Sequence, residues 1–263
     1  MIRSAMEWYM YPVLVVAGIV AGFINTLAGS GSLITLPLLM FAGLPANVAN
    51  ATNRIGIILQ SAVGSFSFRH NRVFEFSEGI WLAVPATAGS LAGALAAVKL
   101  DSRTMEIFIG GLLVFMFFIV LYKPEKWISE KAGYIEKRPK LWQVIIFFLI
   151  GLYGGFIQAG VGFLLLAGLV LGAGLNLTKA NALKVFIVLI YSLAALLVFM
   201  LNKQVDYIAG FTLAAGSMIG AFIGTRVAIT KGPKIVRIIL LVIIAAAAVK
   251  YIGIIDLISR VLS

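Results

Sequence analysis

Runs of mostly apolar residues, each about as long as a transmembrane helix needs, occupy most of this chain. A helix rises about 1.5 Å per residue, so roughly 20 apolar residues cross the hydrocarbon core of a bilayer. The first run contains Asn25 and Thr26 and has a counterpart near mid-chain, so we interpret it as a retained helix and not as a cleaved signal. The predicted spans are Tyr11–Leu27, Val48–Phe68, Ile80–Val98, Met105–Leu121, Leu141–Ile157, Ala180–Leu201, Tyr207–Ala228 and Ile235–Leu257.

The composition supports a membrane location. Hydrophobic residues make up 62% of the chain and charged residues only 12%, which leaves too few charges for a water-facing surface. We therefore expect an all-α integral membrane protein with about eight transmembrane helices and a lipid bilayer around it. Soluble enzymes, disordered regulators and nucleic-acid-binding proteins are excluded at this step. Cysteine is absent, which excludes disulfides and thiolate chemistry.

One polar connector divides the chain. Residues 122–140 carry six of the basic residues against three glutamates. Because basic loops of membrane proteins face the cytoplasm, we predict that this segment is cytoplasmic. It separates a first membrane repeat, residues 1–121, from a second, residues 141–263.

The two halves are related in sequence. A shift of 131 residues aligns Ala28–Ala97 with Ala159–Ala228 without a gap, and 20 of the 70 positions are identical. The matches include rare polar residues such as Asn50 with Asn181, which apolar composition alone does not explain. An inverted arrangement of the halves is favoured over a parallel one. It places the basic cluster that follows Thr225 on the same side as the connector; the cluster comprises Arg226, Lys231, Lys234 and Arg237.

Each half begins with a helix that is followed by a glycine-rich break and a short apolar piece. The short pieces, Leu33–Ala42 and Leu164–Gly172, are too short to span the membrane and are predicted to be half-helices. The first N–H groups of a helix lack partners and carry the positive end of its dipole, which favours a bound anion. The alternative is that the breaks are ordinary kinks for close helix packing. The candidate anion-binding residues in the breaks are Gly29, Ser30, Gly31 and Ser32 in the first half, and Gly160 and Gly162 in the second.

Two cations follow the breaks in a region without acidic residues. No Asp or Glu occurs between Glu7 and Glu75 or between Glu136 and Asp206, yet these windows contain Arg54 and Lys184. A cation within the membrane is costly, so it indicates function unless it snorkels to the interface. Amide and hydroxyl residues accompany both cations at helical spacing. We therefore predict a carboxylate-free anion site that also includes Asn50, Asn53, Ser61, Asn181 and Ser192.

At these residues the chain resembles the TauE/SafE family of sulfite exporters. The resemblance rests on the break with Leu33–Pro37, the turn Gly43-Leu44-Pro45 and the helix start at 49–53, and in the second half on Ala159–Leu166. It implies eight helices in two halves and transport of sulfite or a related small sulfur-containing anion across a bacterial inner membrane. The second half departs from the pattern with Val161 and Phe163, so fewer ligand donors are expected there.

The leading hypothesis is a secondary transporter that exports such an anion by alternating exposure of a site at the membrane midplane. The alternatives are a permease for an unrelated small carboxylate, or a membrane assembly subunit that transports nothing. A membrane-embedded enzyme is disfavoured, because the apolar regions lack a cluster of acids, histidines or cysteines and the single histidine, His70, is expected near the end of a span. We expect no cofactor and no metal. A homodimer is possible.

Overall fold

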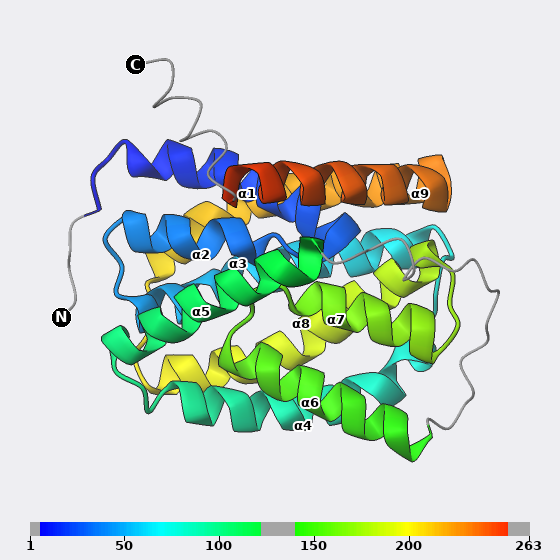
Figure 1. The fold of residues 1–263 in the computed structure, drawn as a ribbon, viewed down its shortest axis with the longest axis horizontal. Coiled ribbons are helices and arrows are strands. Elements are labelled where there is room, and N and C mark those ends of the chain that lie inside the picture. The colour runs from blue at the N-terminus through cyan, green and yellow to red at the C-terminus, as the bar shows by residue number, and fades with distance from the viewer. Residues whose placement is uncertain (1–5, 122–139, 252–263) are drawn as a thin grey trace.

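The structure is a computed structural model that describes residues 6–121 and 140–251. In those residues the chain is helical and contains no strand, and the helices run roughly side by side along the long axis of the molecule (Figure 1). The elements are α1 Met10–Ala28, α2 Ser32–Phe41, α3 Ala46–His70, α4 Phe76–Ala97, α5 Ser102–Leu121, α6 Leu141–Phe156, α7 Val161–Ala167, the π-helical turn η2 Gly168–Gly172, α8 Leu177–Leu201 and α9 Tyr207–Tyr251.

The predicted half-helices correspond to α2 and to α7 with η2, which begin slightly earlier than expected. The two last predicted spans lie in one continuous helix, α9, and the end of the last span, 252–257, lies outside the described residues. Four helical segments of the described chain are long and apolar enough to cross a membrane: Met10–Ala28, Gly79–Ala97, Leu177–Leu201 and Tyr207–Thr230. The number of spans beyond these four stays a prediction. The connector 122–139 also lies outside the described residues.

The helices of the two halves interlock. The first helix of each half packs against the helix that follows the long middle helix of the other half, α1 against α9 and α6 against α4, while α3 and α8 contact each other between these pairs. Glycines on both partners make this close approach possible. A Cβ atom at Gly22 or Gly220 would overlap a carbonyl oxygen across the α1–α9 pair, and one at Gly89 or Gly151 would do so across the α4–α6 pair. The helix backbones therefore touch directly, as small residues allow in membranes.

The backbone repeats with the same period as the sequence. The described residues with positive φ are Gly29, Gly43 and Arg72 in the first half and Gly160, Gly174 and Lys203 in the second, and each pair is separated by 131 positions. Arg72 and Lys203 share a φ of 56°, a left-handed conformation that is uncommon outside glycine. The turns that follow α3 and α8 are therefore built alike.

The equivalent helices α3 and α8 run antiparallel. Thr52, near the start of α3, accepts a hydrogen bond from the Asp206 N–H just after α8, at 2.9 Å. At the other end, Phe76 just after α3 stacks on Phe186 in the first part of α8, with ring centroids 5.0 Å apart. Helix α3 therefore begins where α8 ends.

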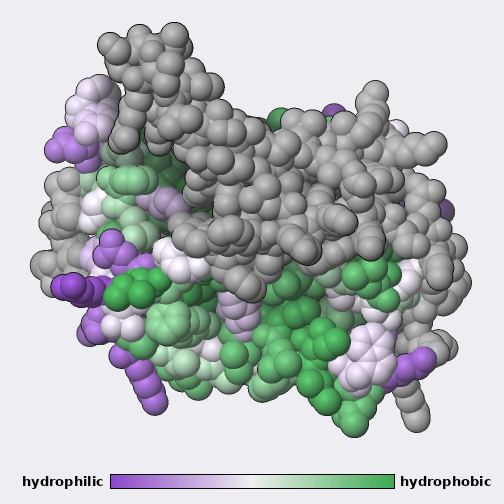
Figure 2. Space-filling model, viewed as in Figure 1, coloured by the Kyte–Doolittle hydropathy of each residue, from purple (hydrophilic) through white to green (hydrophobic). Residues whose placement is uncertain are grey.

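Charge is distributed unequally between the two ends of this bundle. Among the side chains that the structure describes, the end formed by the C-terminus of α3 and the N-termini of α4, α6 and α8 carries five cations, Arg69, Arg72, Lys140, Lys179 and Arg226, against Glu75. At the opposite end, the described side chains include three cations, Lys99, Arg103 and Lys203, against Glu7, Asp101, Glu106 and Asp206. Figure 2 shows a broad field of hydrophobic residues between hydrophilic ones at the left and right margins, as expected for a protein surrounded by lipid.

The glycine contacts between halves can be tested by adding one methyl group. In Gly151→Ala the new Cβ would overlap the Ala86 carbonyl, and we expect a loss of about 1–3 kcal/mol from overpacking. In the control Gly110→Ala, the Cβ would meet no described atom within 4 Å. Thermal unfolding of the detergent-purified variants, followed by size-exclusion fluorescence, measures the difference. Equal melting temperatures for the two variants would contradict the interlocked packing.

Candidate functional site

The two glycine breaks meet inside the bundle. The Gly162 N–H donates a hydrogen bond to the Gly29 carbonyl at 3.1 Å, and a Cβ atom on either residue would overlap the other. Gly29 and Gly160 also adopt left-handed backbone conformations, with φ of 77° and 73°. Glycine is therefore needed here both for conformation and for contact. The two breaks therefore come together from opposite halves of the chain.

Lys184 lies on α8 and its side chain is 1% exposed. Its Nζ donates to the carbonyl oxygens of Asn25 and Thr26, each at 2.9 Å, and to Oδ1 of Asn181 at 2.8 Å. Both carbonyls belong to the last turn of α1, where the helix dipole is negative. An ammonium group has three hydrogens, so these three bonds use all of its donors. The alternative that Lys184 snorkels to the interface is wrong.

Arg54 lies on α3 and is fully buried. Its guanidinium donates to the Gly155 carbonyl at 2.6 Å and to Oε1 of Gln158 at 3.2 Å, and it lies 4.8 Å from the ring centroid of Phe199. Gly155 belongs to the last turn of α6, and Gln158 also donates to the Tyr191 hydroxyl at 2.7 Å. The Nε–H of Arg54 has no partner among the described residues. Snorkelling is wrong for this cation as well.

The two cations thus do the same task in opposite halves. Each lies on the middle helix of one half and binds the C-terminal carbonyls of the first helix of the other half. No carboxylate is buried among the side chains that the structure describes, so backbone dipoles compensate these charges. Lys184 therefore has no donor left for a solute, whereas Arg54 uses two of its five N–H groups in these bonds, and its Nε–H has no partner among the described residues.

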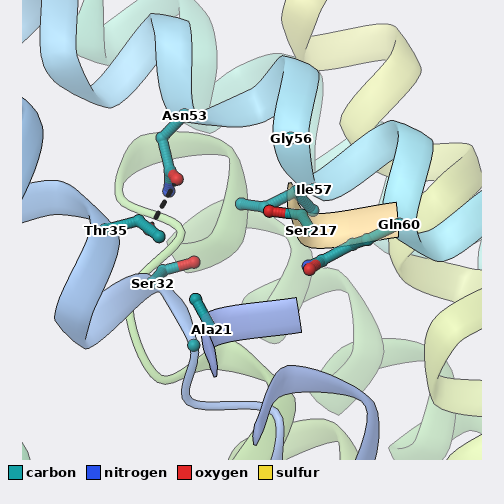
Figure 3. Close-up of a pocket in the computed structure, with 9 residues that line it drawn as sticks. Ala21, Ser32, Thr35, Asn53, Gly56, Ile57, Gln60 and Ser217 are labelled. Carbon is teal, nitrogen blue, oxygen red and sulfur yellow. Dashed lines mark hydrogen bonds between the residues drawn. The ribbon is translucent and has the colours of Figure 1, made fainter. Parts of the chain in front are cut away.

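A small cavity lies beside the break of the first half (Figure 3). It lies near the N-terminus of α2 and has a volume of about 10 Å³, room for about one water molecule. In Figure 3, Ser32 and Gln60 point into this space from opposite sides. Asn53 lines it as well, accepts a hydrogen bond from the Thr35 hydroxyl at 2.7 Å, and keeps its Nδ2 without a partner. The lining residues are Ala21, Gly31, Ser32, Thr35, Asn53, Gly56, Ile57, Gln60 and Ser217.

The corresponding region of the second half is filled by larger side chains. The residues 131 positions after Ser32, Asn53, Gly56 and Gln60 are Phe163, Lys184, Ile187 and Tyr191. Lys184, Ile187 and Tyr191 are buried. The sequence-based expectation that Val161 and Phe163 weaken the second half as a source of ligand donors agrees with this difference.

The structure brings together only part of the predicted anion site. Gly31, Ser32 and Asn53 line the cavity, whereas Gly29, Gly160 and Gly162 form the contact between breaks. Asn50 donates to the Phe156 carbonyl at 2.8 Å, and Asn181 accepts from Lys184. Ser30, Ser61 and Ser192 are buried but do not line the cavity. A role in binding stays a prediction for every residue of the set.

Sequence reasoning missed Thr35, Ser217 and Gln158. Gln158 had a detectable signal, because it is an amide inside an acid-free apolar stretch directly before a break. Thr35 lies three residues after Ser32 on α2 and therefore shares its helix face. Ser217 comes from α9, and no local pattern connects that helix to the break.

Comparison with known proteins identifies the family. Residues 14–251 match the family described as sulfite exporter TauE/SafE. The chain belongs to this family. Its relatives include a "probable membrane transporter protein" of a Sinorhizobium species, which is 27% identical over 93% of both chains. Two others with that description come from Haemophilus influenzae, 28% identical over 86% of this chain and 88% of the relative, and from Escherichia coli K12, 28% identical over 90% and 88%. No solved structure matches the chain. The protein is thus a membrane transporter of the TauE/SafE family, as its sequence motifs predicted.

Because Lys184 donates hydrogen bonds to the last turn of α1, we expect that replacing it lowers the stability of the protein. Lys184→Met keeps a stem of similar length but leaves the Thr26 carbonyl without its hydrogen bond, so we expect a loss of about 1–3 kcal/mol. The exposed Lys99 supplies the control Lys99→Met, which should unfold like the wild type. Thermal unfolding in the same detergent compares them, and a Lys184→Met protein as stable as the control would contradict this role of Lys184.

Proposed function

We propose that this membrane transporter moves a small sulfur-containing oxyanion, with sulfite as the leading candidate, outward across a bacterial inner membrane. The mechanism we propose is alternating access, in which the two halves expose a midplane site first to one side and then to the other. The family supports the substrate class, because its description is that of a sulfite exporter.

The observation that carries the proposal is the meeting of the two breaks beside buried donors. Gly29 and Gly162 touch, and within the described residues no carboxylate is buried near them. Irregular backbone at membrane depth is tolerated where protein or a cavity satisfies it, and a cavity with hydroxyl and amide groups lies next to one break. Such surroundings favour an anion over a cation.

Alternating access of this kind fits an inverted pair of halves. The antiparallel packing of α3 and α8 and the exchange of helix partners between halves support that arrangement. The end of the bundle with five cations would then face the cytoplasm, together with the connector 122–140.

Transport can be measured after the protein is reconstituted in proteoliposomes. We expect uptake of labelled sulfite in preference to an unrelated carboxylate such as acetate, and no uptake of a cation. Arg54→Gln should lower this uptake at least about tenfold, because the last turn of α6 loses its charged donor and a loss of about 1.4 kcal/mol corresponds to that factor.

The control for this measurement is Arg103→Gln, which removes an exposed arginine at the end of the bundle. It should transport like the wild type. Preference for acetate would show a carboxylate permease, and absence of any flux by the well-folded wild type would contradict transport of a small anion.

The inverted arrangement and its orientation can be tested with single cysteines, because the chain has none of its own. Asn71 and Asn202 are exposed equivalents at the ends of α3 and α8. In intact spheroplasts, a membrane-impermeant maleimide should label Asn202→Cys but label Asn71→Cys only after the membrane is opened. Labelling of both residues from the same side would show parallel halves.

A further inference from the structure

We propose that the transported anion binds in one asymmetric place, the cavity beside Asn53 in the first half, and that this place takes a singly charged small oxyanion. This inference rests on the proposed function and adds where the substrate binds and in which charge state. The cavity is defined by Ser32, Thr35, Asn53, Gly56, Gln60 and Ser217 together with the apolar residues between them.

The first observation is a buried amide donor of the lining that has no hydrogen-bond partner among the described residues. Asn53 is 1% exposed, and its Nδ2 has no hydrogen-bond partner, although Thr35 fixes its Oδ1 at 2.7 Å. A buried amide N–H without a partner costs about 1–3 kcal/mol, so a ligand that accepts from it recovers that energy. The fixed Oδ1 also determines the orientation of the amide and keeps Nδ2 available.

The second observation is the N-terminus of α2, which has 10 residues. The N–H groups of Leu33 and Ile34 turn back to the carbonyls of Ser30 and Gly31, and the Ser32 N–H forms no backbone hydrogen bond within the described chain. The positive end of the α2 dipole and the Nδ2 of Asn53 thus border one cavity. A Cβ atom at Gly31 would overlap the Ala21 carbonyl of α1, so glycine is needed at this position for close packing.

The third observation is the lack of charge in the lining. None of the nine lining residues is charged, and the cations next to the site direct their hydrogen bonds to the ends of α1 and α6. The cost of burying an ion grows with the square of its charge, and a helix N-terminus supplies only about half a unit of positive charge. A dianion is therefore poorly compensated here, whereas a monoanion is well matched.

The lining also suits an anion that carries a proton. Gln60 and Ser32 each offer an oxygen that accepts a hydrogen bond, so hydrogensulfite could accept from Asn53 and donate to one of them. The cavity has a volume of about 10 Å³, room for about one water molecule, so it must widen to admit an anion of a few heavy atoms.

The second half does not offer an equivalent place. Phe163, Lys184, Ile187 and Tyr191 stand where the cavity has Ser32, Asn53, Gly56 and Gln60, and Lys184 already uses its three donors. The two halves therefore contribute unequally to the cavity: the first half supplies eight of the nine lining residues, and the second half supplies Ser217.

The test measures equilibrium binding of radiolabelled sulfite to the full-length protein in detergent. Asn53→Leu removes the donor at similar size, and Asn53→Asp keeps the acceptor for Thr35 but turns the donor into an acceptor. We expect affinity to fall at least about tenfold in Asn53→Leu and further in Asn53→Asp, since hydrogen bonds to charged groups contribute about 1.5–3 kcal/mol. Asn202→Leu makes the same change at an exposed turn and should bind like the wild type.

A milder variant covers the case in which the Asn53 variants fail to fold. Gly56→Ala places a methyl group 3.3 Å from Leu213 and 3.6 Å from the Ser217 hydroxyl, at the wall of the cavity, and it should weaken sulfite binding while the protein still folds. Gly110→Ala adds the same methyl group at a position where no described atom lies within 4 Å, and it should bind sulfite like the wild type.

The charge state is tested with three probes. Sulfite should bind more tightly below the pH of its second ionisation than above it. Methanesulfonate should bind equally below and above that pH, and sulfate should not compete with sulfite for binding. Tighter binding of sulfite at the higher pH, or competition by sulfate, would overturn the assignment of a monoanion. Unchanged affinity in folded Asn53→Leu and Gly56→Ala would overturn the location. If the wild type binds none of these probes, the proposed function itself fails.

Discussion

Two helices of this protein end inside the bundle, and a helix end in a bilayer needs partners for its last carbonyl groups. Lys184 supplies them for α1, and Arg54 with the amide of Asn50 supplies them for α6. Each donor comes from the half to which the terminated helix does not belong. The breaks between α1 and α2 and between α6 and α7 can exist only because these cross-half bonds replace the water that would satisfy them elsewhere. The cavity beside the first break depends on the same arrangement.

Much of the fold could be predicted from the sequence because the membrane restricts the choices. Apolar runs of sufficient length identify helices, and the repeat of 131 residues predicted paired breaks, which the paired positive-φ residues reproduce. The exchange of partners between halves could not be predicted, because glycines such as Gly22 and Gly89 indicate close contact without naming the partner helix. The continuation of the last two predicted spans as one helix, α9, was also missed, because the basic residues Lys231 and Lys234 interrupt the apolar run in the sequence.

The candidate site was predicted less completely. Burial of Arg54 and Lys184 agreed with a special role for intramembrane cations, but sequence spacing gave no information on what they contact. Their partners are main-chain carbonyls of residues 101 and 159 positions away. Because every residue has a main-chain carbonyl, the sequence does not indicate which one accepts the hydrogen bond. The donors that remain available belong to Asn53 and to the start of α2, where small residues leave space that the second half has filled.

The interlocking of α1 with α9 and of α4 with α6 has a consequence for biogenesis. During translation, the partner of α1 is the last described element to leave the ribosome, so the glycine surface of α1 has no native neighbour until nearly the whole protein has been made. Neither half is an autonomous module, and a gene split at the connector would give two fragments that must find each other in the lipid. The two halves are therefore related in sequence, but each needs the other to complete its helix packing.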